Sequence, residues 1–287
     1  MTEPGQPDRE ASPRPEAKLD SPGPASGQGW PGPVVKPGWP WPRLRHTGDP
    51  WGQWVHRAEQ LAAAHAQGFP VPAWLRETRG EHRWPVTLSV IAAIVLQILL
   101  PAHLTQPLPP SLLPALEGAL LVGLGIANPV RIERRGRFVR GASIALILLI
   151  TFANAASAVL LIRAILDKAG NSAGPLLATG GSIWATNVIA FALWYWEFDR
   201  GGPVRRALAA SQHPDLLFPQ MTVPELAPTD WEPRFVDYLY LSFTNATAFS
   251  PTDVMPLARW AKLTMLVQSA VSLSMGALVI ARAVNIL

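Results

Sequence analysis

Several polar side chains stand inside long apolar runs of this sequence, where an ionisable or amide group is costly unless it is paired or hydrated. Glu117 lies in the middle of one run, and each of the other long runs carries one amide, namely Gln97, Asn154, Asn187 and Gln268. Such residues either line a hydrated path or hold packed helices together by hydrogen bonds. The amides favour the second interpretation, whereas both stay open for Glu117.

The densest group of polar residues lies in the stretch DYLYLSFTNATAFSPTDVMP, Asp237–Pro256. It begins like an apolar helix and must end near Pro251, because proline lacks the backbone donor that a helix needs. A helix over 235–250 would be about 24 Å long, which is short for a membrane crossing and long for a turn. We therefore expect a short helix, either crossing or re-entrant, whose hydroxyl-rich end faces protein or water. Together with two residues of other runs, its polar residues are the candidates to line a pathway: Asp237, Thr244, Asn245, Thr247, Ser250, Thr252, Asp253, Gln268 and Glu117.

Small residues on the last apolar run form a second pattern. Ser269, Ser272 and Gly276 recur at helical spacing, and small side chains let two helices approach each other closely. The stripe predicts a packing seam, either within one subunit or between the subunits of a homo-oligomer.

Patterns typical of enzymes are missing from the sequence. The six histidines form no HExxH-like cluster, and neither a Gly-rich phosphate loop nor a Ser nucleophile elbow occurs. The chain contains no cysteine, which excludes disulfides and thiol chemistry. We therefore expect no enzyme activity, no catalytic residue, no cofactor and no metal site.

The composition indicates a membrane protein. Of the 287 residues, 49% are hydrophobic and 15% are charged, whereas soluble domains average about 25% charged residues. Five apolar runs approach or exceed the roughly 20 residues that a helix needs to span the hydrocarbon core. They are 84–104, 111–129, 141–162, 176–198 and 260–287. With the stretch around 236–252 as a short fifth segment, the expected fold is an all-α polytopic membrane protein with about six membrane segments.

Three regions follow from this division. Residues 1–48 are rich in proline, glycine, serine and charge, which is typical of a disordered tail. Its tryptophans within Gly29–Pro42 also fit a ligand for a Pro-binding module or a tether at the membrane surface. Residues 49–83 show the spacing of an amphipathic juxtamembrane helix, which lies at the interface or packs on the protein. Residues 84–287 form the predicted transmembrane domain.

Lysine and arginine flank the apolar runs unevenly, and in membrane proteins they gather on the cytoplasmic side. They are frequent before residue 84, in the loop after the second run and in 199–234, and the turn 105–110 has none. If every segment crosses, this asymmetry predicts six crossings with both termini in the cytoplasm. It also explains the basic charge without a nucleic-acid partner.

The aromatic residues of WYWEF, Trp194–Phe198, are interpreted as an aromatic belt at the membrane interface.

Residues 236–287 loosely resemble the pore module of the potassium-channel superfamily, in which a pore helix, a Thr-rich filter, an acidic residue and an inner helix follow one another. FTNATAFSPTD and then RWAKL, which opens the last run, keep this order. The Gly-Tyr-Gly of the filter is absent, and Phe249, Ser250 and Pro251 stand near its place. The resemblance therefore does not imply the usual potassium selectivity.

The C-terminal third, roughly residues 190–287, more closely resembles a bacterial family of multi-pass membrane proteins known as a domain of unknown function. Thr252-Asp253 replaces a Ser-Asp of that family, and Gln268 and Gly276 stand where it often has His and Asn. The matching features are Tyr195, Gly201-Gly202, Phe218-Pro219, Asp237, Tyr240, Ser242, Phe243, Thr244, Ser272 and the terminal VNIL. The resemblance implies a multi-pass protein of the bacterial cytoplasmic membrane, with no activity assigned.

From these patterns we expect a channel-like or transporter-like protein, centred on residues 236–256 and the last helix, that passes an ion or a small solute through the lipid bilayer. The alternative is a non-conducting membrane scaffold whose tail recruits a partner.

Overall fold

The computed structural model describes residues 71–101, 109, 111–127, 137–167, 172–211, 213–223, 227–247 and 253–286. The predicted tail 1–48, most of the predicted juxtamembrane region 49–83 and the candidates Ser250 and Thr252 lie outside these ranges. The described residues are mostly helical, which confirms the all-α prediction.

Five long helices coincide with the five apolar runs: α2 Trp84–Ile98, α3 Leu112–Ala127, α4 Arg137–Leu166, α5 Ala173–Phe198 and α9 Arg259–Ile286. Helices α4, α5 and α9 are long and apolar enough to cross a membrane, and α2 and α3 are shorter apolar helices. Large apolar side chains stay exposed on their outer faces, for example Leu263, Leu266 and Ile280 of α9. Long apolar helices with such faces are typical of a protein embedded in lipid.

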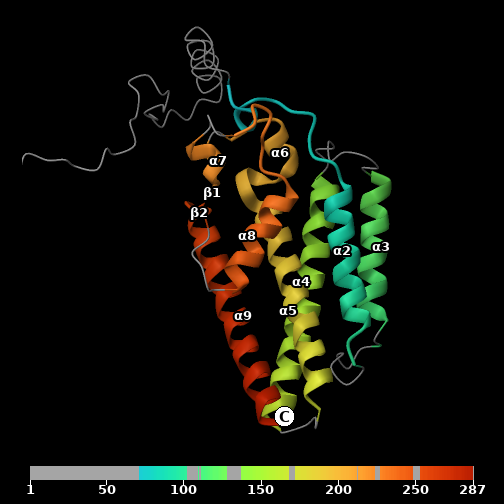
Figure 1. The fold of residues 1–287 in the computed structure, drawn as a ribbon. Helices are drawn as coiled ribbons and strands as arrows, with labels where there is room; N and C mark the ends of the chain where they lie inside the picture. Colours follow the sequence, from blue (N-terminus) through green and yellow to red (C-terminus); the bar gives the residue numbers. More distant parts are fainter. Residues whose placement is uncertain are drawn as a thin grey trace, which may run out of the picture. The chain divides into compact units, whose positions relative to one another are not determined.

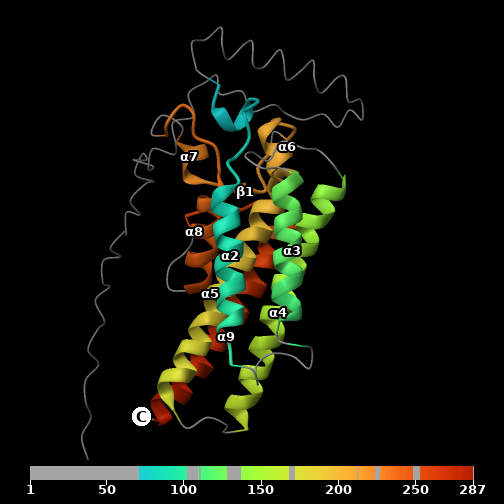
Figure 2. The ribbon, with the colours of Figure 1, turned by 90° about the vertical axis from the view of Figure 1, so that its right-hand side faces the viewer.

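Helix α5 lies at the centre of the bundle and packs against α2, α4, α8 (Phe235–Thr247) and α9 (Figures 1 and 2). Helices α2, α3 and α4 pack together on one side of α5, and α8 and α9 pack together on another. Most side chains in the second half of α5 are buried. Polar groups on α5 therefore meet protein rather than lipid.

Short elements gather at one end of the bundle, where α5 ends and α9 begins (Figure 1). They are η1 Ala73–Leu75, η3 Asp199–Gly201, α6 Pro203–Ala207, β1 Leu216–Leu217, α7 Pro219–Thr222 and β2 Met255–Pro256. Strands β1 and β2 pair antiparallel. Among the described residues, Arg163 and Arg282 lie near the opposite end of their helices. This first end is here called the Arg-rich end, and the arginine and lysine residues there whose burial is described are Arg76, Arg79, Arg83, Arg140, Arg200, Arg205, Arg206, Arg234, Arg259 and Lys262.

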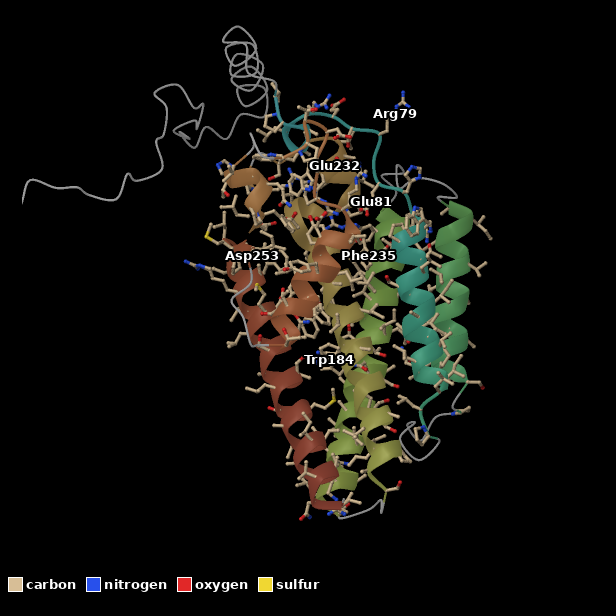
Figure 3. All side chains as sticks on the ribbon, in the orientation of Figure 1. Arg79, Glu81, Trp184, Glu232, Phe235 and Asp253 are labelled. Atoms are coloured by element: carbon tan, nitrogen blue, oxygen red, sulfur yellow. The ribbon has the colours of Figure 1, made fainter. Side chains whose placement is uncertain are left out.

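Helix α8 does not run the whole length of the bundle (Figure 1). It starts at the Arg-rich end and runs only part of the way down the bundle (Figure 1), and Asp253 lies level with Phe235 near the same end (Figure 3). The pairing of β2 with β1 holds the chain there before α9 begins. Helix α9 ends at the opposite end of the bundle from the Arg-rich end (Figure 1), and the number of membrane crossings and the side of the C-terminus stay predictions. Because the chain returns after α8, helix α9 starts at the same end of the bundle as α8 and finishes at the opposite end.

A close contact between α5 and α9 involves Gly180 rather than Gly276. A Cβ atom added to Gly180 of α5 would lie 2.8 Å from Cγ1 of Val279 on α9. A Cβ added to Gly276 would meet nothing within 4 Å among the described residues beyond its own helix backbone. Met275 and Val279, and not Gly276, are the buried residues at this level of α9. Within the described chain the packing seam therefore does not include Gly276, and a seam between subunits stays a prediction.

We expect Gly180→Ala to be less stable than Gly181→Ala by about 1–3 kcal/mol, because the new methyl group overpacks the contact with Val279. Both substitutions gain the same helix propensity, and a Cβ at Gly181 would meet nothing within 4 Å among the described residues. The difference between the two variants therefore isolates the contact. Thermal unfolding of the purified variants in one detergent measures it, and equal stabilities would contradict the close approach of α5 and α9.

Candidate functional site

Gln268 of α9 is the centre of a hydrogen-bonded network between α5, α8 and α9. Its Oε1 accepts hydrogen bonds from the Tyr195 hydroxyl at 2.7 Å and from Asn245 Nδ2 at 2.8 Å. Its Nε2 donates to the backbone oxygen of Ser242 at 2.9 Å and to Ser242 Oγ at 2.7 Å. Gln268, Tyr195 and Ser242 are all fully buried. The amide of Gln268 thus uses both of its donor hydrogens and accepts two bonds.

Further bonds extend this network along the three helices. Asn245 Nδ2 also donates to the backbone oxygen of Met265 at 3.0 Å, and Ser242 Oγ donates to that of Val188 at 2.6 Å. Ser269 Oγ lies 3.1 Å from both oxygen atoms of Asn245, and Asn187 Nδ2 donates to Ser272 Oγ at 3.0 Å. The interpretation of Asn187 and Gln268 as interhelical hydrogen-bonding residues is confirmed. The structure also joins the pathway candidates to the seam candidates, because Asn245 bonds to Ser269.

The hydroxyl groups at the end of α8 bond to their own helix. Thr244 Oγ1 donates to the backbone oxygens of Tyr240 and Leu241, both at 3.0 Å. Thr247 Oγ1 donates to the backbone oxygen of Thr244 at 2.9 Å. Both threonines are half-buried. They stand in the last turn of α8, beside the network but without a described bond to it.

The acidic candidates lie in three separate places. Asp237 sits in the first turn of α8, where its Oδ2 accepts from the backbone nitrogen of Arg234 at 2.8 Å. Asp253 is exposed at the Arg-rich end. Glu117 of α3 is fully buried against α2, where its Oε2 accepts from Gln97 Nε2 at 3.2 Å. Its Oε1 has no hydrogen-bond partner among the described residues. The structure thus brings none of these carboxylates to Gln268.

A second buried cluster, at the Arg-rich end, was not predicted from the sequence. Asp199 follows the last residue of α5 and is fully buried. Its Oδ2 accepts from the Tyr238 hydroxyl at 2.6 Å, and its Oδ1 accepts from the backbone nitrogens of Asp215 at 3.1 Å and Leu216 at 3.3 Å. Asp199 therefore fastens the start of α8 and the strand β1 to the end of α5.

Two buried arginines complete this cluster. Arg206 donates to the backbone oxygens of Trp196 and Asp199, and its guanidinium carbon lies 4.9 Å from the centre of the Tyr238 ring. Arg200 Nη1 donates to the backbone oxygen of Trp74 at 2.7 Å, and its Nε lies 3.9 Å from Asp199 Oδ2. Guanidinium groups thus satisfy the carbonyl groups that the end of α5 leaves without helical partners.

The turn that ends α5 needs glycine at two positions. Arg200, Gly201 and Gly202 have φ values of 51°, 81° and 101°. Left-handed backbone of this kind costs little for glycine and more for other residues. A Cβ added to Gly202 would also lie only 3.0 Å from the backbone oxygen of Glu197. The sequence DRGG thereby reverses the chain tightly enough to bury Asp199.

Glu81 links three parts of the chain at the same end. Its Oε2 accepts from Trp196 Nε1 at 2.7 Å, and its Oε1 accepts from the backbone nitrogen of Phe235 at 2.6 Å. Burial raises the pKa of Glu81 above its usual value, and the two hydrogen bonds oppose that rise. The carboxylate thus fixes where α8 starts relative to α5.

The sequence predicts that the aromatic residues within Trp194–Phe198 form a belt at the interface, but not all of them do. Tyr195 and Trp196 are buried and bond to Gln268 and Glu81. Trp194 Nε1 donates to Thr151 Oγ1 of α4 at 2.9 Å. The prediction is wrong for Tyr195 and Trp196, because α5 is the central helix and both side chains are buried against protein. The sequence signal that could have shown this burial is the DRGG turn directly after WYWEF, because it reverses the chain against the end of α5.

Comparison with known proteins found no family model, no curated protein and no solved structure that matches this chain. The class of protein is therefore defined by its own features. It is a helical protein with three helices long and apolar enough to cross a membrane, a central helix α5, a short helix α8 that ends within the bundle (Figure 1), and two buried polar clusters that attach α8 to α5 and α9.

Proposed function

We propose that this protein is a multi-pass protein of a bacterial cytoplasmic membrane that passes an ion or a small solute, with α8 and α9 at the centre of the route. The observation that carries the proposal is the path of α8, which runs only part of the way along the bundle before α9 begins near the end where α8 starts (Figure 1). In a bilayer, a helix that stops part of the way through leaves backbone groups that only protein or water can satisfy. Interrupted helices of this kind are typical of transporter and channel sites.

The charge distribution supports one orientation for this proposal. The Arg-rich end faces the cytoplasm, since lysine and arginine gather on that side of membrane proteins. Helices α2, α3, α4, α5 and α9 cross the bilayer, α8 enters and leaves from the cytoplasm, and the C-terminus lies outside. This topology keeps the predicted total of about six membrane segments. This topology also fits the distribution of basic residues better than six crossings do, because it places Arg259 and Lys262 on the cytoplasmic side.

The polarity of α8 suggests which solute is favoured. Its C-terminal turn, around Thr244 and Thr247, points into the bundle, and the C-terminal end of a helix carries partial negative charge. Such ends coordinate cations in transporters built from interrupted helices. The network around Gln268 closes the interface between α5, α8 and α9, so a passing cation requires α8 to shift against α9. We therefore propose a gated cation route.

Flux into liposomes tests this proposal. The full chain is reconstituted, and the uptake of potassium, sodium and protons is followed with ion-sensitive dyes. Thr247→Trp should abolish the flux while the protein stays folded, because the bulky indole would obstruct the proposed route beside the last turn of α8. Ser274→Trp is the matched control, since Ser274 is exposed on α9, and it should leave the flux unchanged. A cysteine introduced at Asn285 and labelled with an impermeant reagent reports the orientation. Equal loss in both variants, or no flux above empty liposomes, would contradict the proposal.

A second candidate function is a non-conducting scaffold. The observation that favours it is the network around Gln268, because a closed and fully bonded interface is also what a static packed core would contain. In a scaffold, Thr247→Trp would destabilise the protein by about 1–3 kcal/mol through overpacking, without a separable effect on flux. The flux measurement on the unsubstituted protein therefore separates the two candidates.

A further inference from the structure

A cavity of about 410 Å³ opens between α2, α3, α4, α5 and the segment around α6, at the Arg-rich end. It lies at the ends of these helices. Arg83 immediately precedes α2, Leu124 is in the last turn of α3, Arg140 is in the first turn of α4, and Glu197 is in the last turn of α5. If the long helices span a bilayer, this is the level of the lipid headgroups.

The cavity has a charged part and an apolar part. Arg83, Arg140 and Arg205 line the charged part together with Glu197. Glu197 Oε1 lies 3.4 Å from Arg140 Nε, and Arg83 Nη1 donates to the backbone oxygen of Leu124 at 2.6 Å. One carboxylate thus faces three guanidinium groups, which leaves an excess of positive charge.

The remaining walls are apolar and continue into the bundle. They include Val86, Val90, Leu121, Leu146, Ile147 and Leu193. Of these, Val90, Leu146, Ile147 and Leu193 are buried. A hydrated inorganic anion would cover the guanidinium groups but would leave this apolar surface without a partner. The cavity therefore suits a ligand that is anionic at one end and apolar at the other.

We propose that this cavity binds an anionic phospholipid, with the phosphate diester near Arg140 and Arg205 and part of an acyl chain along the apolar walls. Guanidinium groups bind phosphate oxygens with paired, charge-assisted hydrogen bonds. Arg140 and Arg205 are exposed and can reach such a headgroup, whereas Arg83 is half-buried and already bonded to Leu124. Basic pockets between helices on the cytoplasmic side bind anionic headgroups in other membrane proteins. The site requires a membrane location and does not depend on the proposed transport.

Lipid-dependent thermal unfolding tests the site. The full chain is purified and delipidated in detergent, and then unfolded with added phosphatidylglycerol, with phosphatidylcholine of the same acyl chains, or with inorganic phosphate. Phosphatidylglycerol should raise the unfolding midpoint more than phosphatidylcholine does, because a ligand that binds only the folded state stabilises it. Inorganic phosphate should have no comparable effect.

Variants connect this effect to the cavity. Arg205→Gln should weaken the apparent affinity for phosphatidylglycerol about tenfold, since one charge-assisted hydrogen bond contributes roughly a factor of ten. Arg140→Gln/Arg205→Gln should remove the difference between the two lipids. Replacing Arg140 removes the ion-pair partner of Glu197 and can lower stability by itself. The difference in unfolding midpoint between the two lipids is therefore compared within each variant, where this loss cancels. The matched control is Arg163→Gln, because Arg163 is an exposed arginine near the other end of α4.

Each result decides the proposal. A preference for phosphatidylglycerol that survives in Arg163→Gln and disappears in the double variant supports the site. Equal effects of the two lipids, a full effect of inorganic phosphate alone, or an equal loss in Arg163→Gln would each overturn it.

Discussion

Asp199→Ala is expected to lower the free energy of unfolding by about 3–5 kcal/mol, because it breaks a buried ion pair from one side. The substitution removes the acceptor for the Tyr238 hydroxyl and for the backbone nitrogens of Asp215 and Leu216. It also leaves the buried guanidinium of Arg200 without the nearest carboxylate, at 3.9 Å. Thermal or denaturant unfolding in detergent, followed by circular dichroism, measures the loss.

Two comparisons keep this prediction specific. Asp230→Ala removes an exposed aspartate from the same connecting region and should change the stability by no more than about 0.5 kcal/mol. Asp199→Asn keeps the shape and one acceptor oxygen, so its loss should be smaller than that of Asp199→Ala. If Asp199→Ala and Asp230→Ala were equally stable, Asp199 would not fasten α8 and β1 to α5.

Gln268→Leu is expected to destabilise the protein by about 3 kcal/mol. Each buried group that loses its only partner costs about 1–3 kcal/mol, and the Tyr195 hydroxyl donates to Gln268 at 2.7 Å. The two bonds from Gln268 Nε2 to Ser242 are lost as well. Asn245 keeps its bond to the backbone oxygen of Met265, which limits the damage. The loss is measured by thermal unfolding in detergent.

The control for Gln268→Leu lies on the same helix. Ser274→Ala changes an exposed residue of α9 and should leave the unfolding midpoint unchanged. A Tyr195→Phe variant of the unsubstituted chain should lose less than Gln268→Leu, and adding Tyr195→Phe to Gln268→Leu should cost little more, because the hydroxyl has already lost its partner. Fully additive losses would show that Tyr195 and Gln268 do not act together.

The two buried clusters together explain how α8 is held at its place in the bundle. Asp199, Glu81 and Arg206 fix its first turns at the Arg-rich end, through Tyr238 and the backbone of Phe235. Gln268 and Ser269 fix its last turns, through Ser242 and Asn245. Helix α8 has only 13 residues, and isolated helices of that length are marginal in water. Its place in the bundle therefore depends on these side-chain contacts.

The sequence alone determined the class of fold and the positions of the long helices. Apolar runs of about 20 residues give a local signal, because each helix satisfies its own backbone hydrogen bonds and buries its side chains in lipid or protein. The bounds of α5 and α9 agree with the predicted runs to within a few residues. The sequence also predicted that Asn187 and Gln268 form hydrogen bonds between helices, because amide side chains within apolar helices commonly do so.

Only the tertiary structure decided which polar residues meet. Asp199 and Tyr238 are far apart in the sequence, and so are Gln268 and Tyr195. The periodicity of one helix shows which of its own residues share a face, but it does not show which face of another helix packs against them. The return of the chain after α8 places Met255–Pro256 beside Leu216–Leu217, which is a contact between distant segments. The close contact at Gly180 depends on the facing Val279. Local sequence fixes a helix because its backbone bonds are local, whereas burial of a carboxylate or the turning point of a chain depends on neighbours that folding brings together.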